Sequence, residues 1–314
     1  MRFDFDDINL IPKKCIVGSR SECDTSVEFG GHTFRLPIVP ANMECVIDID
    51  ISIKLARNGF FYILHRFYDN DLILNFIEKM NYENLISSIS LGVNQDSYDL
   101  VEEIINRNLI VNYVTVDIAH GHSVKMEKML NFLKENLPNT FIIAGNVCTV
   151  EAVFDLERWG ADAIKVGIGP GSACTTYPTT GFGSRNCQAS TIYHCATVAN
   201  VPIVADGGIK NPGDIAKSLA LGATMIMTGG LLSGYADSPG QVVQIDGKQY
   251  KEFWGSASSY QSGKSNRIEG KKNLVDFKDQ SIMDGLKHIE ECLQSSISYG
   301  GGTNLTVFDN IQWL

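Results

Sequence analysis

Eight apolar runs of strand length recur along the chain, and segments with helical spacing separate them. The runs cover residues 36–43, 59–65, 85–92, 113–119, 141–146, 163–167, 202–208 and 224–230. The helical segments cover residues 48–57, 70–81, 96–108, 122–136, 149–159, 187–199 and 212–221, and several begin with Asp, Ser or Thr. Strands covered by helices on both faces read as continuous apolar runs. The alternation therefore predicts parallel βαβ units and an α/β fold.

Eight such units favour a single (β/α)8 TIM barrel, although an open doubly wound sheet would show the same alternation. Polar and glycine residues favour the barrel, because "ANM", "DIAHGH", "GIGPG", "DGG" and "TGG" all follow the ends of apolar runs. In a barrel the C-terminal ends of the strands carry the active site. A length of 314 residues allows one large domain or two ordinary ones. We interpret residues 1–314 as one catalytic domain with a flap excursion at about 231–278 and a C-terminal helix within 280–314.

The charge balance restricts the partners of the chain. The sequence has 26 Lys and Arg against 36 Asp and Glu, a net charge of −10. Nucleic acids and anionic membranes require a basic face, so neither is an expected partner. No apolar run approaches the length of a membrane helix. Eight scattered cysteines without a C-x-x-C pair are typical of free thiols in the cytoplasm.

Three glycine loops at adjacent strand ends indicate a phosphate site. Gly167, Gly169 and Gly171 follow the sixth run, and glycines let the backbone approach a bound anion closely. Alone, this loop could be an ordinary set of turns. The loops at 205–209 and 227–230 follow the last two strands, where barrels most often bind phosphate. Together they predict a phosphorylated ligand.

Several side chains on these loops could carry chemistry. Asp206 could accept the two hydroxyl protons of a ribose, or could be a turn or N-cap aspartate. Cys174 sits among free backbone N–H groups that would stabilise a thiolate, although a lone cysteine is often inert. Thr176 could relay a proton or be a turn residue. Arg66 could meet a cofactor phosphate or carboxamide, or pair with an acid.

Two further segments are ambiguous. His120 and His122 have the H-x-H spacing of metal ligands, but no third ligand joins them, so Asp117 on the same strand end is the better candidate for a polar ligand. The polar segment 253–272 could be a lid over the site or a surface loop, and Glu269 is its carboxylate in "IEGKK".

The motifs "ANM", "AGNV", "GIGPGSACTT", "ADGGI" and "GSAS" resemble those of the IMP dehydrogenase/GMP reductase family of (β/α)8 barrels. The resemblance covers nearly the whole chain. No gap between strands could hold the CBS module that the dehydrogenases usually carry, and residues 255–272 contain no Arg-Tyr pair. The chain is therefore most similar to the compact bacterial reductases of the family.

The resemblance implies a reaction and its catalytic residues. The reaction is the NADPH-dependent reductive deamination of GMP to IMP and ammonia, in purine nucleotide interconversion. Cys174 would attack C2 of the guanine and form a covalent thioimidate, which hydride from NADPH then reduces. Thr176 and Glu269 match the residues that protonate the departing amino group.

The resemblance also implies binding residues. The nucleotide would be bound by Ser172, Asp206, Gly207, Gly208, Gly229, Gly230, Gly255, Ser256, Ala257 and Ser258. NADPH would be bound by Arg66, Asp117, Ile118 and Ala119, with Ser19 and Arg20 reaching the cofactor of a neighbouring subunit. A monovalent cation such as K+ would be bound by main-chain oxygens of Gly169, Gly171 and Cys174. Family members of this kind are expected to be cytoplasmic homotetramers.

Some positions depart from the family pattern close to the substrate. Tyr177 stands where relatives usually have Lys or Arg, "SRNCQAS" replaces a more apolar stretch, and "SNRIEG" matches the reductase flap only at its end. These departures leave open a deoxynucleotide or a modified purine as substrate. Two other functions remain open: an IMP dehydrogenase without a CBS module, and a nucleotide sensor that has lost catalysis.

Overall fold

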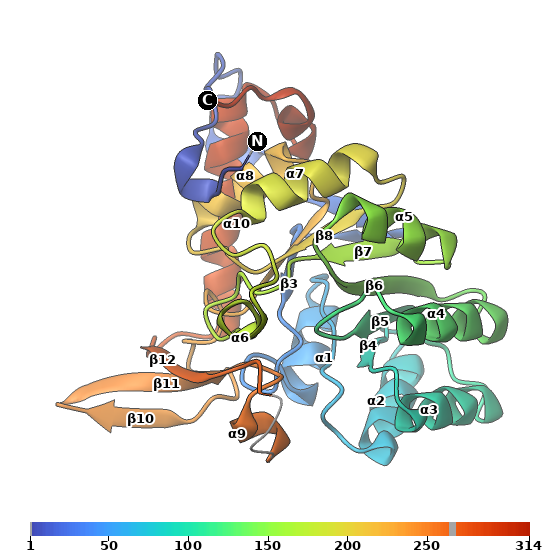
Figure 1. The fold of residues 1–314 in the computed structure, drawn as a ribbon. Coiled ribbons are helices and arrows are strands. Elements are labelled where there is room, and N and C mark those ends of the chain that lie inside the picture. The colour runs from blue at the N-terminus through green and yellow to red at the C-terminus, as the bar shows by residue number, and fades with distance from the viewer. Residues whose placement is uncertain (1, 264–267) are drawn as a thin grey trace.

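A curled parallel sheet forms the centre of the protein, and helices cover its outer side (Figure 1). The computed structural model describes residues 2–263 and 268–314. Within these residues seven parallel strands pair in the order β3-β9-β8-β7-β6-β5-β4. They are β3 (Ile38–Pro40), β4 (Ser88–Leu91), β5 (Tyr113–Asp117), β6 (Phe141–Val147), β7 (Ala163–Val166), β8 (Ile203–Asp206) and β9 (Met225–Thr228). The expected α/β class and the TIM-barrel-like arrangement are confirmed.

The connecting helices occupy the segments with helical spacing. They are α1 (Ile49–Arg57), α2 (Asn70–Tyr82), α3 (Gln95–Asn106), α4 (Val124–Asn136), α5 (Val150–Arg158), α7 (Gln188–Val198) and α8 (Pro212–Ala220). Oxygen-bearing side chains begin several of them, since Asp48, Asp69, Ser123 and Thr149 each accept an N–H bond from the first turn. These caps fix where each helix starts, and so fix the loops that precede it.

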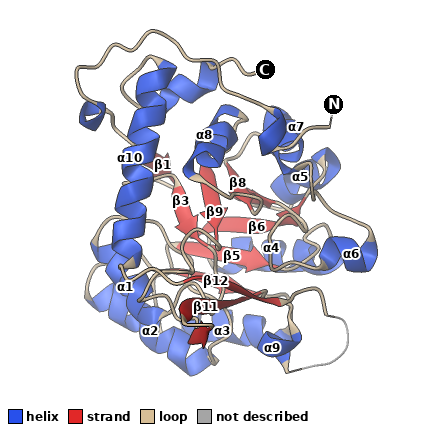
Figure 2. Cartoon of the chain, turned by 90° about the vertical axis from the view of Figure 1, so that its left-hand side faces the viewer, coloured by secondary structure: helices blue, strands red, loops and turns tan. Residues whose placement is uncertain are grey.

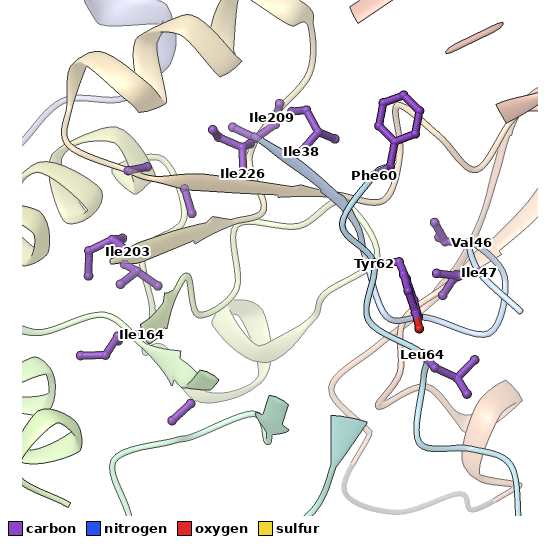
Figure 3. Close-up of a cluster of buried hydrophobic side chains, with 14 of the residues drawn as sticks. Ile38, Val46, Ile47, Phe60, Tyr62, Leu64, Ile164, Ile203, Ile209 and Ile226 are labelled. Carbon is purple, nitrogen blue, oxygen red and sulfur yellow. The ribbon is translucent and has the colours of Figure 1, made fainter. Parts of the chain in front are cut away.

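Alternate residues of the strands enter two different hydrophobic clusters. The outer cluster packs against the helices and takes Ile142 from β6 and, from other strands, Ile38, Ile164, Ile203 and Ile226, which Figure 3 labels. The inner cluster takes Val39, Ile143, Ala163, Val204 and Met225, together with Phe29 and Phe34 of the β1 (Val27–Phe29) and β2 (His32–Phe34) hairpin. Burial of both faces explains why the strands read as continuous apolar runs.

The segment 59–65 does not form the expected eighth strand. Its residues alternate between the two clusters as a strand would, with Tyr62 in the outer cluster and Phe61 in the inner one. Leu64 makes one parallel bridge to Ile89. The next pair of a parallel ladder would use Ile86 O and Ser88 N, but both are bonded to the Tyr62 hydroxyl, at 2.7 and 3.2 Å. The side chain therefore takes the place of the ladder.

The excursion after β9 is structured. It contains the antiparallel strands β10 (Val242–Ile245), β11 (Lys248–Trp254) and β12 (Lys272–Asp276) and the short helix α9 (Ser259–Ser262). The β10–β11 hairpin extends away from the central sheet (Figure 1). Phe253 and Trp254 at the end of β11 are buried, so the strand is anchored at its inner end.

The long helix α10 (Ile282–Gly300) precedes the C-terminal tail, and the two ends of the described chain lie together near α7, where Phe3 and Trp313 contact Tyr193 (Figure 2). Leu10 and Trp313 form an antiparallel bridge, and Asn9 N donates to Leu314 O at 2.7 Å. No helix in the described ranges is long and apolar enough to cross a membrane.

Candidate active site

A cavity of about 730 Å³ opens at the C-terminal ends of the parallel strands. This is the edge at which the sequence predicted the site. Seventeen of the expected site residues line it: Arg66, Asp117, Ile118, Ala119, Gly169, Gly171, Ser172, Cys174, Asp206, Gly207, Gly208, Gly229, Gly230, Gly255, Ser256, Ala257 and Glu269. A cavity of this size can hold a nucleotide.

Cys174 heads a chain of two hydrogen bonds. Its thiol donates to Thr176 Oγ1 at 3.2 Å, and the Thr176 hydroxyl donates to Glu269 Oε2 at 2.6 Å. Cys174 and Glu269 line the cavity, whereas Thr176 is buried beneath them. The arrangement connects a nucleophilic atom to a carboxylate through a hydroxyl that can pass a proton in either direction.

Backbone pairing brings Glu269 to the cysteine loop. Cys174 and Gly270 form an antiparallel bridge, in which Thr175 N donates to Glu269 O at 2.8 Å and Lys271 N to Ala173 O at 2.9 Å. On the other side Gly270 bridges Ser258. A Cβ at Gly270 would lie 2.8 Å from Ser258 N, so only glycine fits between the two segments.

The glycine loops at the ends of β7 and β8 pack against one another. Gly167 has φ +148°, and a Cβ there would lie 1.9 Å from the carbonyl oxygen of Asp206. The buried side chain of Gln188, at the start of α7, joins the two loops by donating to Val166 O at 2.9 Å and to Asp206 O at 3.1 Å. The Gln188 side chain thus fixes the two glycine loops relative to each other.

A buried lysine pairs with both aspartates of the cavity. Lys165 Nζ lies 2.7 Å from Asp206 Oδ2 and 3.0 Å from Asp117 Oδ1. Asn146 Nδ2 also donates to Asp206 Oδ2, at 2.7 Å, and Asn42 Nδ2 to Asp117 Oδ2, at 2.8 Å. Both bonds to Asp206 end on Oδ2, and no described residue donates to Oδ1. The cavity-lining carboxylate therefore keeps one oxygen available as an acceptor.

The ion pairs keep Asp117 and Lys165 charged. Burial opposes ionisation of Asp117, but the ammonium of Lys165 and the amide of Asn42 outweigh it, and the pKa of Asp117 is lowered. Burial likewise opposes the charge of Lys165, yet Asp117 and Asp206 raise the pKa of the lysine to about 12. The lysine is therefore a cation throughout the physiological pH range.

Arg66 lies at the Asp117 side of the cavity. Its positive charge contributes to lowering the pKa of Asp117, and its guanidinium lies over the ring of Phe67 at 5.2 Å. Among the described residues no carboxylate pairs with Arg66. The alternative that this arginine only serves an ion pair is therefore not supported, and its charge remains available to a ligand.

Some expected residues lie away from the cavity. Arg20 lines a separate surface hollow of about 420 Å³ beside the end of α10, and Ser19 caps the short helical turn that contains Arg20. Ser258 is buried next to the cavity and accepts from Gln261 N as the cap of α9. The first three residues of the "SNRIEG" match, 265–267, lie outside the described residues.

His120 and His122 do not form a metal site with other residues of the described ranges. His122 Nε2 lies 2.7 Å from Asp155 Oδ2, and His120 is exposed. No group of three or more His, Cys, Asp or Glu side chains suited to a metal ion occurs in the part of the chain that the structure describes.

Sequence reasoning missed the side chains that hold the site together. Lys165 is one charged residue inside the apolar run "AIKVG", and Asn42 and Asn146 are the polar residues of "ANM" and "AGN". A charge in a strand buried on both faces should have signalled a buried ion pair. Gln188 gave no such signal, because it lies in the stretch that departs from the family pattern.

Two of the departures lie together at the edge of the cavity. Arg185 lines the cavity, and its guanidinium lies 5.8 Å from the centre of the Tyr177 ring. The contact has the geometry of a cation–π interaction. A positive charge therefore stands beside position 177 even though that residue is aromatic.

Comparisons with known proteins identify relatives along nearly the whole chain. The family model described as "IMP dehydrogenase / GMP reductase domain" matches residues 2–313. The chain is 54% identical over 312 residues to a GMP reductase of Bacillus subtilis, which covers 99% of this chain and 95% of that protein. It is 52% identical to a GMP reductase of Bacillus licheniformis and 51% identical to one of Clostridium acetobutylicum, each over 99% of this chain and 95% of the relative.

Proposed function

The chain belongs to the IMP dehydrogenase/GMP reductase family, and on that premise we propose that it is a GMP reductase. It converts GMP, with NADPH as reductant, into IMP and ammonia. The observation that carries the proposal is the chain of hydrogen bonds from Cys174 through Thr176 to Glu269 at the edge of a nucleotide-sized cavity. A deamination needs a nucleophile and a proton donor at one carbon atom, and this chain supplies both.

The three residues divide the chemistry between them. Cys174 Sγ forms a bond to C2 of the guanine while the thiol proton passes to Thr176, whose own proton passes to Glu269. The same proton returns through Thr176 to the 2-amino group, and the C2–N bond breaks with release of ammonia. Protonation is necessary because an amide ion is a very poor leaving group. The product of this half-reaction is a thioimidate on Cys174.

NADPH fits the side of the cavity that carries Asp117, Ile118, Ala119 and Arg66. There the guanidinium of Arg66, which pairs with no carboxylate of the described residues, and the partly buried carboxylate of Asp117 lie in one wall, as a cofactor with phosphate and amide groups requires. When bound, the cofactor supplies the hydride that converts the thioimidate to IMP. The task of the protein is to hold the purine C2 against Cys174 and to exclude water from the thioimidate, for which residues 255–258 and 269–271 cover the loop.

The opposite side of the cavity suits the nucleotide. Asp206 Oδ1 is free to accept the ribose hydroxyls, and Gly207, Gly208, Gly229 and Gly230 with Ser172 surround the expected place of the phosphate. A Cβ at Gly230 would meet no atom within 4 Å, so its backbone borders open space in which an anion can lie. We assign Gly255, Ser256 and Ala257 to the same ligand, with Ser258 holding their turn.

K+ is proposed as a ligand of the cysteine loop. Within the described residues the carbonyl oxygens of Gly169 and Cys174 accept no backbone hydrogen bond, whereas Gly171 O accepts from Cys174 N at 3.0 Å. Free carbonyl oxygens on one loop are the ligands that a monovalent cation needs.

The proposal extends to assembly. We assign Ser19 and Arg20 to the cofactor of a neighbouring subunit in a cytoplasmic homotetramer. Support comes from their position, since both lie outside the cavity and Arg20 lines an exposed hollow. The 314 residues then act as one catalytic domain, with the excursion at 231–278 bordering its site.

Absorbance at the NADPH band, recorded with a panel of purine nucleotides, tests the function. We expect NADPH consumption that depends on GMP and releases one ammonia per NADPH. Faster turnover of dGMP or of a modified guanine nucleotide would correct the substrate. Formation of XMP from IMP with NAD+, or tight binding of GMP without turnover, would contradict the reductase.

A further inference from the structure

Lys165 is placed between the two ligand-binding sides of the cavity. It lies in β7, and its ammonium reaches Asp117 at the end of β5 and Asp206 at the end of β8. The side chain is 3% exposed. Gly145 on the neighbouring strand β6 makes room for it, because a Cβ there would lie 2.7 Å from Lys165 Cβ. A strand residue thus serves two separated loops at once.

The local charges make the lysine indispensable to both carboxylates. One ammonium faces two carboxylates, and among the described residues their other hydrogen-bond donors are the neutral amides of Asn42 and Asn146. The positive charge of Arg66 also acts on Asp117. Because both carboxylates bond to the same nitrogen, they lie within the range in which like charges disfavour each other's ionisation. Removing the lysine would leave them facing one another in a buried site.

We propose that Lys165 is a positioning residue that couples the nucleotide and cofactor sides of the cavity, because its single ammonium orients the carboxylates of both Asp206 and Asp117. The inference rests on the proposed function for the identity of the two ligands. It does not require the lysine to touch either of them. Its loss is expected to weaken both binding sites together, although both aspartates are still present.

Calorimetric titration of GMP, and separately of NADP+, into the protein tests the coupling. In Lys165→Met at pH 8, we expect the affinity for each ligand to fall by about tenfold or more, because the carboxylate pair retains a proton. Lys134→Met is the matched control, since Lys134 forms a single ion pair with Asp162 outside the cavity and should leave both affinities unchanged.

A second variant separates coupling from simple damage. In Lys165→Met/Asp117→Asn, the charge that opposed Asp206 is gone, so GMP affinity should recover by about threefold or more over Lys165→Met while NADP+ affinity does not. If Lys165 only filled space, a second substitution on the cofactor side would not restore nucleotide binding. Wild-type affinities in Lys165→Met, or the absence of recovery in the double variant, would overturn the proposal.

Stability without ligand decides the inference independently of the function. In Lys165→Met a carboxylate pKa raised above its unfolded value makes the folded state bind more protons, so stability is present at low pH and lost as pH rises through the folded pKa. The thermal midpoint of Lys165→Met should therefore be lower at pH 8 than at pH 5.5, relative to wild type. Adding Asp117→Asn to this variant should remove the difference. If wild type fails to bind GMP, the proposed function is wrong, whereas a flat profile in Lys165→Met would refute the coupling.

Discussion

The hydroxyl of Thr176 donates to the carboxylate of Glu269 at 2.6 Å, although 93 positions separate the two residues in the sequence. The contact exists because the segment around Gly270 pairs with the cysteine loop through its backbone. The fold, and not a local motif, thus makes the chain of hydrogen bonds that we propose as the proton path. Its removal should therefore impair the chemical step without disturbing the binding of the nucleotide.

Replacing Thr176 by Val tests the path. Valine has nearly the shape of threonine but can neither accept from Cys174 nor donate to Glu269. We expect kcat to fall by about 100- to 10,000-fold, with KM for GMP little changed. Steady-state rates of NADPH oxidation measure both constants. Thr179→Val, at an exposed position of the short helix α6 (Thr176–Thr180), should keep normal rates, and equal loss in the two variants would argue against a relay.

Cys174→Ala should abolish turnover while leaving GMP binding intact. The sulfur atom forms the covalent bond in the proposed mechanism, so its loss should lower kcat by about a thousandfold or more. Mass spectrometry of the protein mixed with GMP should detect an adduct in wild type and none in the variant. Cys292→Ala, on α10, is the control. Substantial residual activity of Cys174→Ala would exclude the thioimidate.

Gly167→Ala should destabilise the protein far more than Gly181→Ala. Both glycines have positive φ, but a Cβ at Gly167 would lie 1.9 Å from Asp206 O, whereas one at Gly181 would meet nothing within 4 Å. We expect a loss of about 1 kcal/mol for Gly181→Ala and more than about 4 kcal/mol for Gly167→Ala. Urea unfolding of the two variants measures the difference, and similar midpoints would show that the loop can relax.

Acid should destabilise the protein partly through His65. Burial lowers the pKa of His65 to about 4, and its Nε2 has no hydrogen-bond partner among the described residues. The folded state thus binds fewer protons than the unfolded state between about pH 6.5 and 4, so stability is complete above that window and declines as pH falls through it, by about 3 kcal/mol. His65→Asn should flatten this part of the stability profile, since an amide oxygen can still accept from Phe67 N. An unchanged slope would place the proton elsewhere.

The fold could be predicted from the sequence where burial alone decides the structure. Seven apolar runs became strands because the sheet buries both of their faces, and the helices follow at the expected positions. Residues 59–65 have the same pattern but not the ladder, because the Tyr62 hydroxyl occupies the groups of Ile86 and Ser88. Hydrophobic patterning does not encode such a competition between a side chain and the backbone.

The site could be predicted only in part. The glycine loops and Cys174 were visible because their residue types are unusual at strand ends. The excursion after β9 was expected as a flap whose polar part, 253–272, could be a lid or a surface loop. Its strands were missed because the β10 and β12 faces remain partly exposed and carry no alternating apolar signal. The paired role of Lys165 was hidden, since an ion pair joining three strands has no signature in one segment.

The bridge between Gly270 and Cys174 has a consequence for heat inactivation. Glu269 is held to the cysteine loop by a few backbone bonds beside the cavity, whereas the sheet is buried on both faces. Local openings of a protein cost less than global unfolding where few apolar contacts are lost. Catalysis should therefore cease, reversibly, at temperatures where circular dichroism still records a folded barrel.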